Sequence, residues 1–263
     1  MTDTSVAQPK QAFGVGAIVG ESFSIFFRNI VTVMILGFFP TLIGFVISGM
    51  LIGTDATLGE AEPQFANGLD VINFIVSILA QMATYGIAIA LLVQMAYDAK
   101  LGRALSIKRY IGPAVGSVVP ILVLTSLAGI FAGIGFVALI IPGLWIYAML
   151  SVTVPAIVID RAGFGGLGRS ASLTKGYRWP IVGTLLLIII CTMLLSFAAA
   201  FVAGIILAMT GGSLFSAGLS LLTFSAINGA VYGLTGISIA LIYARLREIK
   251  EGIGVDQLAS VFE

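Results

Sequence analysis

The chain is dominated by apolar stretches that are longer than the core of a soluble domain can use. Between residues 30 and 247 these stretches alternate with short polar segments. A helix needs about 20 apolar residues to cross the hydrocarbon layer of a bilayer, and several stretches reach that length. The residues are 59% hydrophobic and only 10% charged, far from the usage of soluble domains. The sequence therefore predicts an all-α integral membrane protein.

A bundle of six spans is expected. The stretch 118–159 contains no charged residue, and as one helix it would be roughly 60 Å long, about twice the hydrocarbon thickness. We expect it to reverse at Pro142 and Gly143, because proline breaks the hydrogen-bond ladder and glycine accepts the conformations of a turn. Pro113 is expected to open the span before this turn. The six predicted spans are 30–52, 71–96, 114–141, 144–159, 180–209 and 219–246.

The returning limb of this middle hairpin is short. It contains Pro155 and ends at Asp160, so we expect the turn to lie below the outer surface. Unpaired backbone groups that face lipid cost several kcal/mol. The sequence therefore predicts a packed, partly central hairpin that other helices shield.

The charges of the polar segments predict the orientation. The segments 100–109 and 161–178 are cationic, 53–70 is acidic, and 210–218 is uncharged. Short loops rich in Lys and Arg stay in the cytoplasm. We therefore expect both termini to be cytoplasmic, with outer loops at 53–70, 142–143 and 210–218.

Interfacial amphipathic helices are expected on the cytoplasmic side, each before a pair of spans. Such a segment precedes the first, third and fifth spans, and it suggests a weak threefold repeat, although any protein built from two-span hairpins has similar connectors. The predicted organisation is 1–29 as an N-terminal segment, 30–247 as the membrane domain and 248–263 as a short tail. The apolar stripes that indicate the first two helices are Val19, Phe23, Phe26 and Ile30, and Ile107, Ile111, Ala114 and Val118.

The composition excludes several functions. The chain has no histidine and one cysteine, Cys191, so it can form neither a Ser-His-Asp site nor a Cys-rich metal site nor an internal disulfide. No ionisable residue is expected deep in a span, which is unfavourable for an ion-coupled transporter. A net charge of +1 argues against nucleic-acid binding. We expect no catalytic residue, no metal and no cofactor.

Polar and small residues within the spans allow two interpretations. Gln81, Gln94 and Asn228 either hydrogen-bond between helices or line a small hydrophilic cavity. The motifs Gly129-x-x-x-Gly133 and Gly229-x-x-x-Gly233 permit close helix approach, within the bundle or between copies of the chain.

The densest polar cluster follows the middle hairpin. Basic side chains at the level of the headgroups attract anionic lipids by about 1 kcal/mol each, and tryptophan anchors at this level. The alternative is that these cations only fix the orientation and that one of them pairs with Asp160. The candidate residues for a lipid headgroup or a partner are Arg161, Arg169, Lys175, Arg178 and Trp179.

The same region resembles a known family, the glycerophosphoryl diester phosphodiesterase membrane-domain proteins. The resemblance covers about forty residues and implies an integral inner-membrane protein. It implies no catalytic residue here, because the spans leave no room for a phosphodiesterase domain. The matching residues are Ile141, Pro142, Gly143, Pro155, Ala156, Asp160, Gly168, Arg169, Ser170, Leu173, Thr174, Gly176 and Trp179.

The expected function is that of a non-enzymatic membrane component that acts through contacts with lipids, anionic ones among them, or with a partner protein. A homo-oligomer is compatible with the glycine motifs. One alternative is a small-solute transporter or lipid-moving protein, for which the sequence predicts a water-accessible cavity lined by Gln81, Gln94 and Asn228. A second alternative is the membrane subunit of a separately encoded enzyme.

Overall fold

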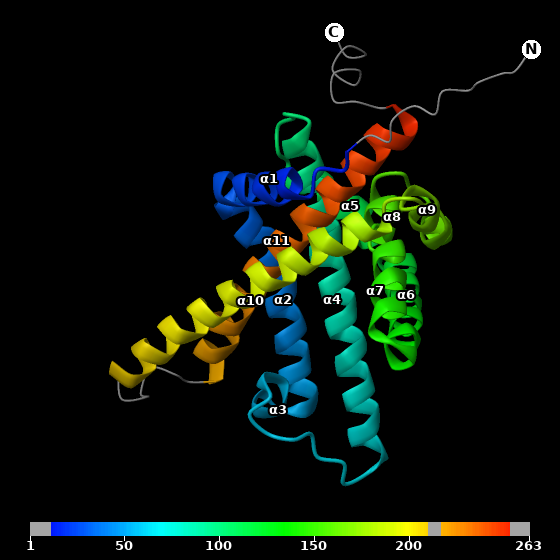
Figure 1. Ribbon diagram of the computed structural model, residues 1–263. Helices are drawn as coiled ribbons and strands as arrows, with labels where there is room; N and C mark the ends of the chain where they lie inside the picture. The colour runs from blue at the N-terminus through cyan, green and yellow to red at the C-terminus, as the bar shows by residue number, and fades with distance from the viewer. Residues whose placement is uncertain (1–11, 210–216, 253–263) are drawn as a thin grey trace, which may run out of the picture.

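The described part of the chain is built from helices alone. The computed structural model describes residues 12–209 and 217–252, and it contains no strand there (Figure 1). The elements are α1 (Val15–Arg28), α2 (Ile30–Ile52), α3 (Thr54–Leu58), α4 (Gly68–Lys100), α5 (Ile107–Gly116), α6 (Val118–Ala138), α7 (Ile140–Leu150), α8 (Thr153–Val158), η1 (Gly163–Gly165), α9 (Gly166–Leu173), α10 (Arg178–Met209) and α11 (Ala217–Glu251).

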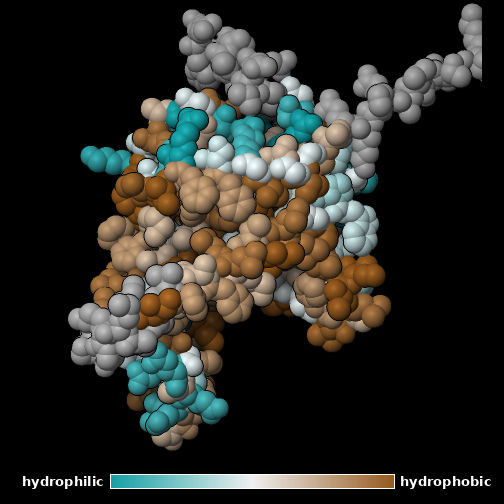
Figure 2. Space-filling view, turned by 60° about the vertical axis from the view of Figure 1, so that its left-hand side comes forward, coloured by the Kyte–Doolittle hydropathy of each residue, from teal (hydrophilic) through white to brown (hydrophobic). Residues whose placement is uncertain are grey.

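Six segments are long and apolar enough to cross a membrane. They lie in α2, α4, α6, α7 with α8, α10 and α11. On the face that Figure 2 shows, apolar residues form a broad band, and hydrophilic residues gather at its two ends. The predicted all-α bundle of six spans is confirmed, and the chain is a multi-pass membrane protein.

One end of the bundle carries most of the described cations. Residues 98–109, 160–178 and 245–251 meet there, and we call it the charged end. Residues 12 and 252, where the described chain begins and ends, lie at this same end, whereas α3 lies at the opposite one (Figure 1). Of the predicted outer loop 210–218, all but 217 and 218 lies outside the described residues.

The centre of the bundle is formed by α2, α4 and α11. A Cβ added to Gly229 would lie 2.8 Å from the backbone nitrogen of Phe38, and one added to Gly233 would lie 2.3 Å from Val33 Cγ1. The motif Gly229-x-x-x-Gly233 therefore brings α11 against α2 within the bundle. Gln81 Nε2 donates to Ser48 Oγ at 2.9 Å, which joins α4 to α2 as the packing interpretation predicted.

Short amphipathic helices precede the pairs of spans, as predicted. They are α1, α5 and α9. The predicted stripe on α1 was displaced by about one residue, because the buried face consists of Ile18, Ser22, Ile25 and Phe26. On α5 the buried residues are Tyr110 and Ala114, whereas Ile111 is exposed.

The helices α1 and α9 bury corresponding positions, which favours the weak repeat. Ser22 and Ser170 are fully buried, and Ile25 and Leu173 are buried three residues later. The intervening positions Ser24 and Ser172 are exposed in both helices.

The expected position of Pro113 was wrong. This residue lies inside α5, and the helix ends only at Ser117, which has φ −102° and ψ 8°. The third span consequently begins at Val118 and not at residue 114. A proline inside a helix removes one backbone hydrogen bond, and α5 ends within one turn after it.

The reversal of the middle hairpin was also misplaced. It occurs at Leu139, while Pro142 and Gly143 lie in the first turn of α7, where proline needs no hydrogen-bond partner. A Cβ on Gly135 would lie 2.9 Å from Gly143 Cα, so Gly143 permits close contact between the two limbs. The backbone nitrogens of Leu139 and Gly143 remain hydrogen-bonded, at 3.0 and 3.3 Å.

Only the returning limb of this hairpin is packed as predicted, because 50% of the window formed by α7 and α8 is buried, whereas the outgoing limb α6 lies at the edge of the bundle. Only 22% of the apolar window of α6 is buried, against 61% for that of α11. The tip residues Val137, Ile140 and Ile141 are strongly exposed. No shielding by other helices is required, because a single non-helical residue leaves so few backbone groups unpaired.

The fourth span is broken between α7 and α8, next to the charged end. Three carbonyls at the break accept hydrogen bonds from hydroxyl groups: Ala148 from Ser151 at 2.9 Å, Leu150 from Thr153 at 2.7 Å, and Met149 from Ser170 at 2.8 Å and Thr174 at 3.1 Å. Irregular backbone inside a membrane protein survives where such groups satisfy it. The helix α9 is thereby fixed against the end of α7.

Candidate functional site

An ion network joins three elements at the charged end. Asp160 follows α8, Arg169 lies in α9, and Arg247 and Glu251 lie one turn apart at the end of α11. Arg169 Nε donates to Asp160 Oδ2 at 2.7 Å, and its Nη2 donates to Glu251. Arg247 Nε donates to Glu251 Oε2 at 2.9 Å, and its Nη1 lies 3.4 Å from Asp160 Oδ1. We call these four residues the paired network.

The paired network contains one of the five predicted site residues, Arg169. The side chain of Arg169 is 31% exposed. Burial lowers the pKa of its guanidinium, but the hydrogen bonds to Asp160 and Glu251 outweigh this and raise the pKa above its ordinary value. The prediction that one cation pairs with Asp160 is confirmed, and two carboxylates already engage Arg169.

Three other predicted cations have no carboxylate partner within the described residues. Arg161 and Lys175 are exposed, and Arg178 is half-buried. Trp179 follows Arg178 and is 57% exposed, as suits an anchor at the membrane surface. We call Arg161, Lys175, Arg178 and Trp179 the unpaired belt.

Local structure explains how the belt is presented. Arg161 has φ 55° and lies in the turn after α8. The helix α9 ends at Leu173, and Gly176 adopts φ 87°, a conformation that glycine accepts without strain. This turn leaves Lys175 exposed and starts α10 at Arg178. The positive end of the α10 dipole lies at the same place.

Arg178 is the most unusual member of the belt. Its guanidinium carbon lies 3.9 Å from the ring centroid of Trp145 in α7, a cation–π arrangement. Its Nε is buried and has no hydrogen-bond partner in the described part of the molecule. A buried donor without an acceptor is costly, and no carboxylate of the described residues balances the charge of this half-buried side chain, which is therefore suited to an anion.

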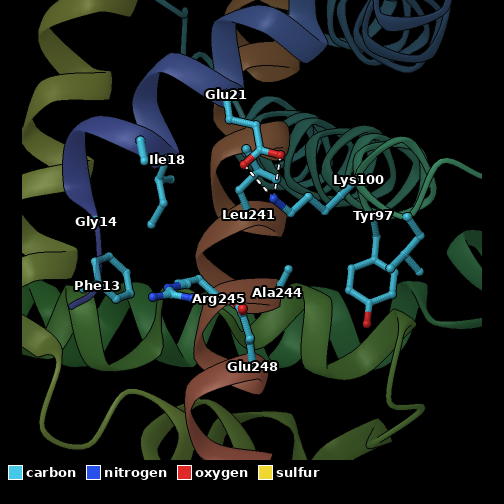
Figure 3. A pocket seen from close by; sticks show the side chains of 12 residues that line it. Phe13, Gly14, Ile18, Glu21, Tyr97, Lys100, Leu241, Ala244, Arg245 and Glu248 are labelled. Atoms are coloured by element: carbon cyan, nitrogen blue, oxygen red, sulfur yellow. Dashed lines mark hydrogen bonds and ion pairs between the residues drawn. The ribbon is translucent and has the colours of Figure 1, made fainter. Parts of the chain in front are cut away.

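The charged end also contains a polar cavity whose cations are paired, unlike those of the unpaired belt. It has a volume of about 300 Å³ and lies between α1, α4 and α11 (Figure 3). Lys100 Nζ lies 2.6 Å from Glu21 Oε1 on one side, and Arg245 Nη1 lies 2.6 Å from Glu248 Oε2 on the other. Both cations are neutralised, so this cavity offers an anion less than the unpaired belt does.

Two of the three amides within the spans donate to backbone carbonyls of the described chain, and the third, Gln81, lines a very small cavity. Gln94 Nε2 donates to the carbonyls of Ala90 and Tyr110 at 3.0 and 3.1 Å, and Asn228 Nδ2 donates to Phe224 at 2.9 Å. The cavity beside Gln81 has a volume of about 20 Å³, room for about one water. The described residues also contain no group of three or more His, Cys, Asp or Glu side chains that could hold a metal ion.

The sequence interpretation missed three residues of this site. Arg247 and Glu251 stand four residues apart on one helix, a spacing that could have indicated their pairing. Nothing in the sequence marks Trp145 as the partner of Arg178, because the two residues meet only in the folded chain.

Comparisons of the chain with protein-family models, curated proteins and solved structures found no match.

Proposed function

We propose that this protein is a non-enzymatic membrane component that binds anionic lipid headgroups at the unpaired belt. Phospholipid phosphates lie at the level where exposed basic and aromatic residues flank a span. The belt supplies three cations without carboxylate partners and one exposed tryptophan. The four-residue paired network beside it holds α8, α9 and α11 in position.

The single observation that carries the proposal is the environment of Arg178. Its guanidinium lies against the Trp145 ring at 3.9 Å, and its Nε is buried without a partner. An arginine can hold a phosphate through two parallel hydrogen bonds. A lipid phosphate would therefore balance the charge of Arg178, which no carboxylate of the described residues offsets.

We also propose that the charged end faces the cytoplasm and that the membrane is a bacterial inner membrane. The cationic loops support the orientation through the positive-inside rule. The cytoplasmic leaflet of cell membranes carries anionic lipids, which places a suitable ligand at the proposed site.

Membership of the glycerophosphoryl diester phosphodiesterase membrane-domain family is likewise a proposal, supported only by the matching residues. Several of them have structural contacts here: Arg169 and Asp160 belong to the paired network, and Ser170 and Thr174 satisfy Met149. A shared motif made of such residues would indicate a shared broken span. It would not indicate an activity.

The test replaces Arg161, Lys175 and Arg178 together by Gln. Wild-type protein reconstituted in nanodiscs of phosphatidylglycerol and phosphatidylcholine should retain phosphatidylglycerol preferentially when its bound lipids are measured by native mass spectrometry. Each cation contributes about 1 kcal/mol, so the triple variant should lose up to about 100-fold in affinity and retain the two lipids in their bulk ratio.

A control variant removes unpaired charge elsewhere on the charged end. Arg28 and Lys108 also lack a carboxylate partner in the described chain, and they are replaced by Gln together. This variant should keep most of the preference for phosphatidylglycerol. Equal losses in the two variants would mean that surface charge alone attracts the lipid. An unchanged preference in the belt variant, with loss of a co-purifying protein, would favour the partner-protein alternative.

A further inference from the structure

A cavity of about 180 Å³ opens within the apolar band, on a part of the molecule that the proposed function does not use. It lies between α4, α6, α11 and the break that separates α7 from α8. None of the side chains that line it is charged. Ile89 in α4 is one of them, and it lies 11 residues before Lys100, roughly 16 Å along the helix. The cavity therefore extends from the break, next to the charged end, to well below that end on the α4 side.

Two backbone features create this space. The break after Leu150 interrupts the wall that a continuous helix would form. Gly129 of α6 faces the cavity, and a Cβ added there would meet no heavy atom within 4 Å. An apolar cavity of about 150 Å³ accommodates benzene. This one accommodates a ring or a segment of one hydrocarbon chain, not a whole lipid.

The polar atoms of the cavity suit an uncharged ligand that accepts hydrogen bonds. The hydroxyls of Thr125, Ser151 and Thr153 donate to carbonyls of their own chain segments, at 2.6, 2.9 and 2.7 Å. The hydroxyls of Tyr85 and Tyr147 make no hydrogen bond to the described residues. They are the available donors, and a carbonyl oxygen is the acceptor that an uncharged lipid brings to this depth.

The rim of the cavity faces the bilayer. Tyr85 and Tyr147 are 38% and 41% exposed, and both lie within candidate spans. Gly129 is also exposed, in the least buried of the six spans. A ligand would therefore enter sideways from the lipid.

We infer that this cavity binds one acyl chain of a bilayer lipid, with its ester carbonyl hydrogen-bonded to Tyr85 or Tyr147. The chain fills the space beside Gly129, and the rest of the lipid stays in the bilayer. Trp145, which contacts Arg178, and Tyr147 are two residues apart on α7 and so point in nearly opposite directions. The acyl-chain site and the unpaired belt are separate, and either can be wrong without the other.

The test uses phosphatidylcholine with a photoactivatable diazirine in one acyl chain, in vesicles of phosphatidylcholine. Because this lipid has no net charge, its labelling does not depend on the belt. We expect saturable crosslinks on the segment 147–154, identified by peptide mass spectrometry and displaced by unlabelled lipid. Labelling that is evenly distributed over the spans and not saturable would overturn the inference.

Two glycine variants give a matched comparison. Gly129→Leu fills the cavity, and we expect it to lower labelling of 147–154 at least fivefold. The control is Gly133→Leu. Gly133 lies one turn after Gly129 on the same helix, and an added Cβ there also meets open space, but Gly133 does not line the cavity. This variant should leave the labelling unchanged. Equal labelling in both variants, with both folded by circular dichroism, would contradict an acyl-chain site.

A third variant tests the hydrogen bond. Tyr85→Phe with Tyr147→Phe keeps the shape of the cavity and removes both free donors. We expect saturation at about a threefold higher lipid concentration, the size of one ordinary hydrogen bond. An unchanged midpoint would show that neither tyrosine binds the carbonyl.

Discussion

Arg169 of the paired network and the cations of the unpaired belt lie in one short stretch of chain, residues 161–178, yet only Arg169 is paired with carboxylates in the described chain. Arg169 and Arg247 each contact two carboxylates. Arg161, Lys175 and Arg178 contact none in the described chain. Arginines that form ion pairs with carboxylates hold helices in position, whereas unpaired arginines remain available to a ligand. Cationic character in the sequence does not distinguish these two roles.

A similar contrast separates the two aspartates that end spans. Asp98 ends the second span and pairs with Arg109 of the following helix α5, as Asp160 pairs with Arg169 of α9. Only the second pair is extended by residues of α11. Asp98 is therefore held by two arginines close to it in the chain, Arg103 and Arg109, whereas Asp160 belongs to a network that reaches α11.

The largest expected effect concerns the orientation on which the belt depends. In a Cys191→Ala background, a cysteine at Asp55 should react with a membrane-impermeant maleimide on intact cells, and a cysteine at Lys100 should react only after lysis. The cationic loops predict this all-or-none difference. The reverse pattern would place the belt on the outer surface and remove the argument for its ligand.

Arg169→Gln should destabilise the protein most among the cation variants. It leaves Asp160 and Glu251 with one arginine between them, and a partly exposed network of this kind should lose about 2 kcal/mol. Thermal unfolding in detergent measures the loss. The preference of the folded fraction for phosphatidylglycerol should not change. If this preference falls as far as in the belt variant, the network and the belt do not have separate roles.

Arg178→Lys should have an intermediate effect on lipid binding and little effect on stability. Lysine keeps the charge but loses the planar contact with Trp145 and the two-pronged hydrogen bond. We expect about threefold weaker retention of phosphatidylglycerol, corresponding to the energy of one cation–π contact. Retention equal to wild type would show that charge alone matters at this position.

Arg109→Gln should have the smallest effect. The side chain of Arg109 is 55% exposed, and Arg103 remains close to the buried carboxylate of Asp98 after the substitution, so the loss of stability should be small. The thermal unfolding midpoint of the Arg109→Gln variant should match that of wild type within error. A shift as large as that of Arg169→Gln would mean that the ion pair between Asp98 and Arg109 also holds its helices in position.

Apolar length and loop charge were sufficient to predict the six spans, because a bilayer imposes both directly. Positions that depend on packing were predicted less well. The reversal lies at Leu139 because the facing residues Gly135 and Gly143 allow the limbs to meet close to it, which the pair Pro142 and Gly143 alone could not reveal.

The two glycine motifs show the same limit. Gly229-x-x-x-Gly233 contacts α2, whereas Gly129 and Gly133 face open space. Their spacing is identical, so only the neighbours in the fold decide between packing and cavity. Likewise the sequence placed five residues in one candidate site, but which cations are paired depends on Arg247 and Glu251, which lie 78 and 82 residues after Arg169.

The most direct measurement of the central claim is the distance between arginine side chains and lipid phosphorus. Protein labelled with ¹³C at arginine Cζ is reconstituted in phosphatidylglycerol bilayers, and ¹³C–³¹P dipolar dephasing is recorded by solid-state NMR. We predict dephasing that falls in Arg178→Gln and is unchanged in Arg169→Gln. Dephasing that survives Arg178→Gln in full, or that is lost in Arg169→Gln, would contradict the assignment of the unpaired cations to lipid.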